Sequence, residues 1–214
     1  MPDLTITVQK AEAVPLAAQP TINFDLRIEN ANPDEPINTA ILRCQFQLEV
    51  ARRQYNAQDQ ENLRDLFGTP DRWGQTLRPM LWTHASVVVP AFTGGITLSV
   101  PVVCTFDFNI GATKYFAGVS EGDIPLCLMF SGTVFYEDAE GCSRVAPISW
   151  DKEARFRLPV SVWKQMMDLY YPNCAWLCLR KDAFEKIHRF KIDRGIPTWE
   201  ETIDRIFSEV LISK

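Results

Sequence analysis

The chain has 214 residues, of which 46% are hydrophobic, and a formal net charge of −5. This length allows one large or two small domains with an ordinary core, and the negative charge argues against general affinity for nucleic acid, which needs a clustered positive surface. No window approaches the roughly 18–20 uninterrupted apolar residues of a membrane span, and the N-terminus lacks a signal-peptide layout, so we expect a cytoplasmic protein.

The first three quarters of the sequence are typical of β-structure. Residues 4–8, 22–28 and 40–50 alternate apolar with polar side chains, which is the period of a sheet with one wet face. Further strands are predicted at residues 83–89, 96–108, 124–136 and 144–150, the last two joined by an acidic hairpin at 137–141. We therefore predict a mostly β protein whose residues 1–158 form an antiparallel β-sandwich.

Two helices are predicted outside the strands. Residues 59–67 place three apolar side chains on one face before Gly68 and predict a single helix inserted into the sandwich. A second helix is expected to begin near Pro159, where proline suits the first turn, and to stop at Pro172. Residues 159–173 are thus a linking helix.

The last forty residues carry the strongest local signals. Asp182 with Glu185, and Thr198 with Glu201, match capping boxes that begin two helices, and Gly195 ends the first of them. A strand is predicted ahead of them at 176–181, so residues 174–214 form a strand-helix-helix tail. This tail is expected either to pack on the sandwich or to form a homodimer.

No catalytic or metal-binding signature stands out. Ser161 and Lys164 have the spacing of penicillin-binding enzymes, but the companion motifs are absent, and a serine near a helix start is usually a cap. Cys174 and Cys178 have three residues between them, whereas a zinc knuckle usually has two. His84 and His188 are the only histidines and have no nucleophile at a recognisable spacing. We expect no catalytic residue, metal or cofactor, and six free thiols at Cys44, Cys104, Cys127, Cys142, Cys174 and Cys178.

The connection at residues 68–82 combines tryptophan with arginine, which is the composition of interaction hot spots. Arg72, Trp73, Arg78 and Trp82 are therefore the candidate partner-binding residues. The alternative is that both tryptophans fold inward and close the mouth of the sandwich.

The tail resembles the ribbon-helix-helix unit of bacterial regulators, through residues 176–181, the two capped helices and the segment from Gly195 to Ile203. In that family the strand pairs across a dimer and enters the DNA major groove. The resemblance implies Arg180 and Lys181 as DNA-binding residues, although only Arg180 is a good donor among the side chains expected to face outward.

Over its full length the chain resembles an uncharacterised bacterial family of unknown function. The resemblance rests on Leu66-Phe-Gly68, Arg72-Trp73, the strand at 101–105, Phe130-Ser-Gly132 and the joint from Phe156-Arg-Leu-Pro159 to Tyr171-Pro172. Members of that family tend to be encoded near uptake nickel-iron hydrogenases, which implies an accessory or assembly role.

Two functions follow from this sequence. The first is a non-catalytic binding or accessory protein that assists a partner protein complex, a hydrogenase being one candidate. The second is a ribbon-helix-helix DNA-binding regulator with the sandwich as its sensor domain. An enzyme ranks third, because acid, base and nucleophile side chains do not cluster.

Overall fold

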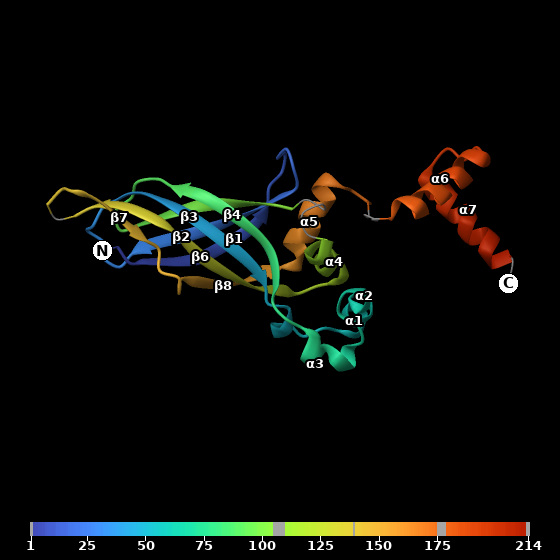
Figure 1. Ribbon diagram of the computed structural model, residues 1–214, viewed down its shortest axis with the longest axis horizontal. Coiled ribbons are helices and arrows are strands. Elements are labelled where there is room, and N and C mark those ends of the chain that lie inside the picture. Colours follow the sequence, from blue (N-terminus) through green and yellow to red (C-terminus); the bar gives the residue numbers. More distant parts are fainter. Residues whose placement is uncertain (1, 105–109, 139, 175–178, 213–214) are drawn as a thin grey trace. The chain divides into compact units, whose positions relative to one another are not determined.

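The computed structural model describes residues 2–104, 110–138, 140–174 and 179–212, which divide into two compact units, Met1–Asn173 and Cys174–Lys214 (Figure 1). The first unit is the predicted antiparallel β-sandwich, and the second contains two helices. None of the helices in the described residues is both long and apolar enough to cross a membrane.

Two antiparallel sheets form the sandwich. The first has the order β1-β2-β5, and its strands are β1 (Leu4–Ala13), β2 (Thr21–Asn30) and β5 (Gly95–Val103). The second has the order β4-β3-β6-β7, with β8 also paired to β6; its strands are β3 (Ile37–Leu48), β4 (Met80–Val89), β6 (Asp123–Glu137), β7 (Ser143–Pro147) and β8 (Glu153–Pro159). The long strands β3 and β6 form the centre of this second sheet.

The core lies between the sheets because one face of each strand is apolar. Phe24 on β2 contacts Phe46 on β3, with ring centroids 4.9 Å apart, and the exposed fraction of both side chains is 0%. Phe24 also meets Trp82 on β4 edge to face. The alternation in residues 22–28 and 40–50 therefore predicted the inward faces correctly.

Helices close one end of the sandwich (Figure 1). The ring of Phe116 on α4 (Ile110–Gly118) stacks on Trp163 of α5 (Val160–Tyr170) at 4.3 Å and also contacts Trp82. The helix expected from Pro159 is α5. Helix α4 was not predicted: the strand expected at 96–108 ends at Val103, and its residues 105–108 lie outside the described residues.

Residues 59–67 are helical and end at Gly68 as predicted, but they form two short helices, so the prediction of a single inserted helix is wrong. The structure has η1 (Val50–Arg52), α1 (Ala57–Asn62), α2 (Arg64–Phe67), η2 (Pro70–Arg72) and α3 (Trp73–Thr76) between β3 and β4. The break falls at Leu63, whose side chain is 1% exposed. Leu63 packs closely on Gly118: a β-carbon added to Gly118 would lie 2.6 Å from the Leu63 Cδ2 atom. Tertiary packing thus overrides the local helical pattern. Strand β8 was also missed, because residues 144–150 were expected to be the last strand.

The second unit contains α6 (Lys181–Asp193) and α7 (Trp199–Ile212). The cap at Thr198 is confirmed, since its hydroxyl accepts a hydrogen bond from the Glu201 N–H at 3.2 Å. The cap at Asp182 is wrong: α6 begins at Lys181, two residues earlier than expected, and Arg180 at its N-cap provides no side-chain cap. Of the strand predicted at 176–181, residues 176–178 lie outside the described residues, and 179–181 are not in a strand.

Candidate functional site

A buried ion pair fastens the inserted helices to the sandwich. Arg53 follows η1 and Asp59 lies on α1; their side chains are 8% and 1% exposed, with Nη2 and Oδ2 3.2 Å apart. The other oxygen, Oδ1, accepts hydrogen bonds from the N–H and hydroxyl of Ser120, at 2.9 and 2.6 Å. Asp59 therefore joins α1 to the loop that follows α4.

Arg53 extends this network to the backbone. Its guanidinium donates to the carbonyl oxygens of Asp123 and Glu121, while its buried Nε has no partner among the described atoms. The network lines an open cleft of about 670 Å³. The other two arginines at the cleft are also paired: Arg52 with Glu49 at 3.2 Å, and Arg157 with Asp123 at 3.4 Å. Among the described residues, each arginine of this cleft thus already has an acidic partner, and the buried Arg53 fastens α1 to the sandwich.

Two tyrosines lie beside the ion pair. The hydroxyl of Tyr55 donates to the carbonyl of Val50 at 2.7 Å and lies 3.0 Å from the hydroxyl of Tyr115. Burial raises the pKa of both tyrosines above the usual value, so both stay protonated at neutral pH. They act as hydrogen-bonding groups of the core rather than as bases.

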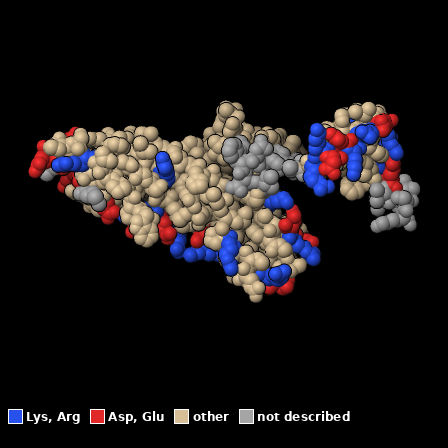
Figure 2. All heavy atoms as spheres, viewed as in Figure 1, with Lys and Arg blue, Asp and Glu red and all other residues tan. Residues whose placement is uncertain are grey.

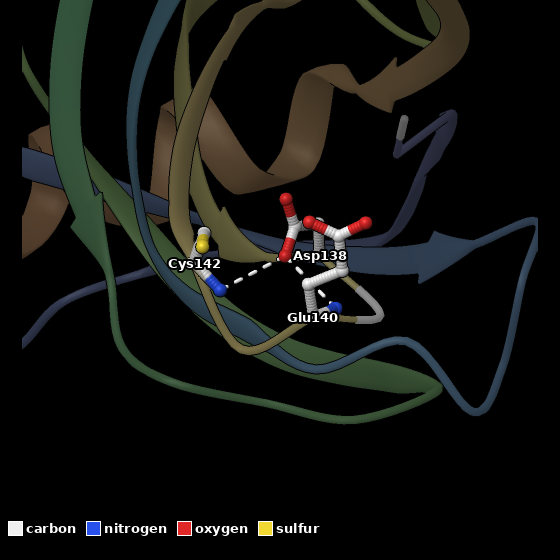
Figure 3. A group of neighbouring side chains, drawn as sticks. All are labelled: Asp138, Glu140 and Cys142. Carbon is white, nitrogen blue, oxygen red and sulfur yellow. Dashed lines mark hydrogen bonds between the residues drawn. The ribbon is translucent and has the colours of Figure 1, made fainter.

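The hairpin between β6 and β7 brings together Asp138, Glu140 and Cys142, whose ligand atoms lie within 4.8 Å of one another (Figure 3). Asp138 is already occupied: its Oδ1 accepts from the N–H groups of Glu140 and Cys142, and its Oδ2 pairs with Arg144 at 2.7 Å. These partners, the Cys142 N–H first, hold the pKa of Asp138 below its usual value. The cluster is best explained as the closure of a turn.

Of the four residues predicted to bind a partner, the two tryptophans are buried and the two arginines are exposed. Trp73 begins α3 and Trp82 lies on β4, with 7% and 5% exposure, so the irregular loop expected at 68–82 contains a helix and part of a strand. Both indoles fold inward, as the alternative proposed, because each is surrounded by other aromatic rings. Arg72 and Arg78 are exposed, and Arg78 donates to the carbonyl of Leu77 at 2.9 Å. Partner binding through these two arginines stays a prediction.

The other polar candidates are far from a catalytic arrangement. His84 is exposed on β4, with its Nε2 3.3 Å from the Gln45 side chain, and His188 stacks on Phe184 in the second unit. Ser161 is exposed on α5, and Lys164 donates to the carbonyl of Ser120. Cys174 is exposed, and Cys178 lies outside the described residues.

A row of apolar side chains crosses the outer face of the five-stranded sheet. Ile41 lies opposite Val88 on β4 and Thr133 on β6, and Thr133 lies opposite Pro147 on β7. Residues directly opposite in antiparallel strands share a face, so Val88, Ile41 and Pro147 lie in one row that includes the polar Thr133, and Phe135 with Val145 forms the next row. The outer-sheet patch consists of Ile41, Val88, Phe135, Val145 and Pro147.

The patch is uncovered. Val88 is 67% exposed, Val145 64% and Ile41 44%. Figure 2 shows a broad uncharged surface over the first unit, with most of its charged side chains at the left end and along the lower side. Sequence reasoning missed this site, although the signal was present: Ile41 occupies a polar position in the alternation of residues 40–50.

The fold and these surfaces define a mostly β protein, an antiparallel sandwich followed by a C-terminal helix pair. The family model of DUF6084, a family of unknown function, matches residues 1–212, and the chain belongs to that family. The resemblance to an uncharacterised family is thereby confirmed. No curated protein is similar to the chain.

Several solved structures show a weak likeness. The CARDB domain of the PF1109 protein from Pyrococcus furiosus, in complex with di-metal ions, is 13% identical, with a TM-score of 0.29 over 74% of this chain and 92% of that one. A putative ApaA protein from Bordetella pertussis is 15% identical, with a TM-score of 0.24 over 73% and 93%. A β-glucosidase from Kluyveromyces marxianus is 8% identical, with a TM-score of 0.25 over 73% of this chain and 15% of that one. TM-scores this low do not establish a shared fold or function.

Proposed function

We propose that this protein acts by binding, as an accessory or assembly factor, and that the outer-sheet patch is the surface that contacts its partner protein. The observation that carries the proposal is the gathering of five apolar side chains in two adjacent rows across four strands, with exposed fractions up to 67%. Burying apolar surface is worth roughly 25 cal/mol per Å², and contiguous exposed apolar patches commonly mark interaction sites.

The surroundings of the patch suit a protein interface. The next row of the same face is polar, because Arg43 lies opposite Ser86 and Ser131. Trp150, three residues beyond Pro147, is 92% exposed, and tryptophan is enriched among the residues that dominate binding energy. An apolar centre with a polar rim and an aromatic anchor is the usual anatomy of such interfaces.

Site-specific photo-crosslinking in host cells tests this proposal. A photoreactive amino acid at Val88 or Val145 should crosslink to the same partner protein, and Trp150→Ala should weaken that crosslink severalfold. Thr97, exposed on β5 of the other sheet, is the matched control and should give no such product. Equal crosslinking from Thr97, or none from the patch, would contradict the proposal. Subunits and assembly proteins of nickel-iron hydrogenases are the first partners to look for, on the sequence resemblance.

A DNA-binding regulator is the second candidate, and it rests on the ribbon-helix-helix resemblance. Arg180 is paired with Asp182 at 3.4 Å, and Lys181 lies 3.8 Å from Glu185. A gel-shift assay against host promoter fragments separates the two functions, since only a regulator would shift specific DNA and lose the shift on Arg180→Ala.

A further inference from the structure

The terminal unit has little core of its own. In its described part only Ile196 and Thr202 are buried, whereas Phe207 is 64% exposed, Phe184 44% and Trp199 39%. A unit of about forty residues rarely buries enough apolar surface to be stable without a partner, a metal or disulfides. We therefore expect another protein surface to cover its exposed aromatic side chains.

These side chains form one continuous seam. Trp199, Ile203 and Phe207 are spaced by four residues along α7, as are Phe184 and His188 along α6, so each set lies on one face of its helix. The two sets meet, because the ring centroid of Trp199 lies 5.4 Å from that of Phe184 and 5.8 Å from that of His188. We call these five residues the terminal seam.

The two helices carry opposite charge. Helix α6 holds four Lys or Arg against three Asp or Glu, a net charge of +1, and Arg180 and Arg194 flank it; helix α7 holds one Lys or Arg against four Asp or Glu, a net charge of −3. Within the described residues, only the pair of Arg194 with Glu209 connects α6 to α7 as a salt bridge.

Several charged side chains of the two helices have no ion-pair partner among the described residues. Lys186 and Arg189 on α6, and Glu200 and Asp204 on α7, are exposed and form no ion pair in the described part of the protein. The terminal unit thus presents an apolar seam bordered by a basic helix and an acidic helix. A surface of complementary charge would place an acidic helix opposite α6 and a basic helix opposite α7.

We propose that the terminal unit is a homodimerisation module, in which α6 of one chain packs against α7 of a second copy around a two-fold axis. A two-fold interface is self-complementary, so the basic α6 of each chain meets the acidic α7 of the other. Residues 1–173 hold fourteen basic and twenty acidic residues, a net charge of −6, so they complement basic α6 but not acidic α7, whereas a second copy of the unit complements both. The dimer would present two copies of the outer-sheet patch, but it does not depend on that patch.

Sedimentation equilibrium of the full chain tests the proposal. The wild type is expected to dimerise, with a dissociation constant that rises with salt because the helix charges are screened. Phe207→Glu should raise that constant by about 30-fold or more, as hot-spot substitutions do. Ser208→Glu, which places the same charge next to the seam, is the control and should change it little. Circular dichroism establishes that each variant keeps its fold.

A charge exchange gives the sharper result. The double variant Lys186→Glu/Arg189→Glu makes both helices acidic, and Glu200→Lys/Asp204→Lys makes both basic, so each alone should be monomeric. Mixed together they should form a one-to-one heterodimer, because every α6 then meets an α7 of opposite sign.

Three outcomes overturn the proposal. They are a monomeric wild type whose seam is protected from hydrogen exchange by residues 1–173, a dimer indifferent to Phe207→Glu, and double variants that fail to restore each other. Crosslinking from Val88 and Val145 addresses the outer-sheet patch separately, so failure of either proposal leaves the other standing.

Discussion

Asp59 accepts hydrogen bonds from three groups, two on Ser120 and one on Arg53. Replacing it by alanine leaves the guanidinium of Arg53 buried without its countercharge, which typically costs about 3–5 kcal/mol of unfolding free energy. Asp59→Asn should cost less, because the amide oxygen still accepts from Ser120. Urea denaturation measures both.

Asp65 provides the control for this prediction. It pairs with Lys114 at 2.5 Å, but its side chain is 71% exposed and that of Lys114 49%. Solvent screens such a pair, so Asp65→Ala should cost about 1 kcal/mol or less. If Asp59→Ala and Asp65→Ala lowered the unfolding free energy equally, burial would not determine how much each ion pair contributes to stability.

Gly132 occupies a position that no other residue fits. Its φ is +145°, and a β-carbon there would lie 1.9 Å from the carbonyl oxygen of Ile41 on the neighbouring strand. Gly132→Ala must therefore push β6 away from β3 at the centre of the larger sheet, and we expect a loss of about 3 kcal/mol or insoluble protein.

Thermal unfolding of Gly132→Ala beside Gly74→Ala checks this expectation. Gly74 lies on α3, and a β-carbon added there would meet no other atom within 4 Å, so its substitution should be neutral or mildly stabilising. A Gly132→Ala protein with wild-type stability would refute the steric explanation.

At the scale of secondary-structure elements, the two helices of the tail begin differently. Thr198 caps α7 through the Glu201 N–H, whereas the Asp182 carboxylate contacts Arg180 and caps no N–H in the described structure. Thr198→Ala should therefore destabilise the first turn of α7 by about 1 kcal/mol.

Hydrogen exchange followed by NMR resolves this difference locally. The Glu201 amide should exchange about fivefold faster in Thr198→Ala, as about 1 kcal/mol implies. Asp182→Ala should leave the amides of α6 nearly unchanged. If the Glu185 amide exchanged faster in Asp182→Ala, Asp182 would cap α6 as the sequence predicted.

The elements themselves were predictable where the pattern was local. Alternation located β2 and β3, and the phrase around Gly195, whose φ is +61°, located the turn between α6 and α7. Helix α4 was not predicted because its Tyr115 and Phe116 favour strands and because it contains two residues of low helix propensity, Gly111 and Gly118. Its helical state is fixed by packing on Trp82 and Trp163.

At the scale of the whole molecule, burial makes the cysteine thiols differ in reactivity. Burial raises the pKa of Cys44 and Cys104 to about 12, and that of Cys127 to about 11, whereas Cys142 is exposed. Since the thiolate is the nucleophile, these three cysteines should react with a thiol reagent far more slowly than Cys142 in the native protein at pH 8.

Mass-spectrometric mapping of the labelled peptides measures these rates. Raising the pH toward 10 should still leave the three buried thiols slow, because their pKa values lie above that range. Denaturation should expose six thiols. Labelling of Cys44 or Cys104 as fast as Cys142 would contradict the packing of the core.

The sequence by itself determined the features that depend on neighbouring residues: the mostly β class, the inward faces of β2 and β3, the cap at Thr198 and the turn at Gly195. Each follows from spacing along one segment, where side-chain direction and backbone conformation are set locally.

Only the tertiary structure decided features that join distant segments. It buried Trp73 and Trp82, divided the predicted helix at Leu63, and paired Arg53 with Asp59. It also aligned Ile41 with Val88 and Thr133 to make the outer-sheet patch. The physical reason is that burial and strand register depend on which segments meet in space, and an exposed apolar side chain is recognised only once its neighbours are known.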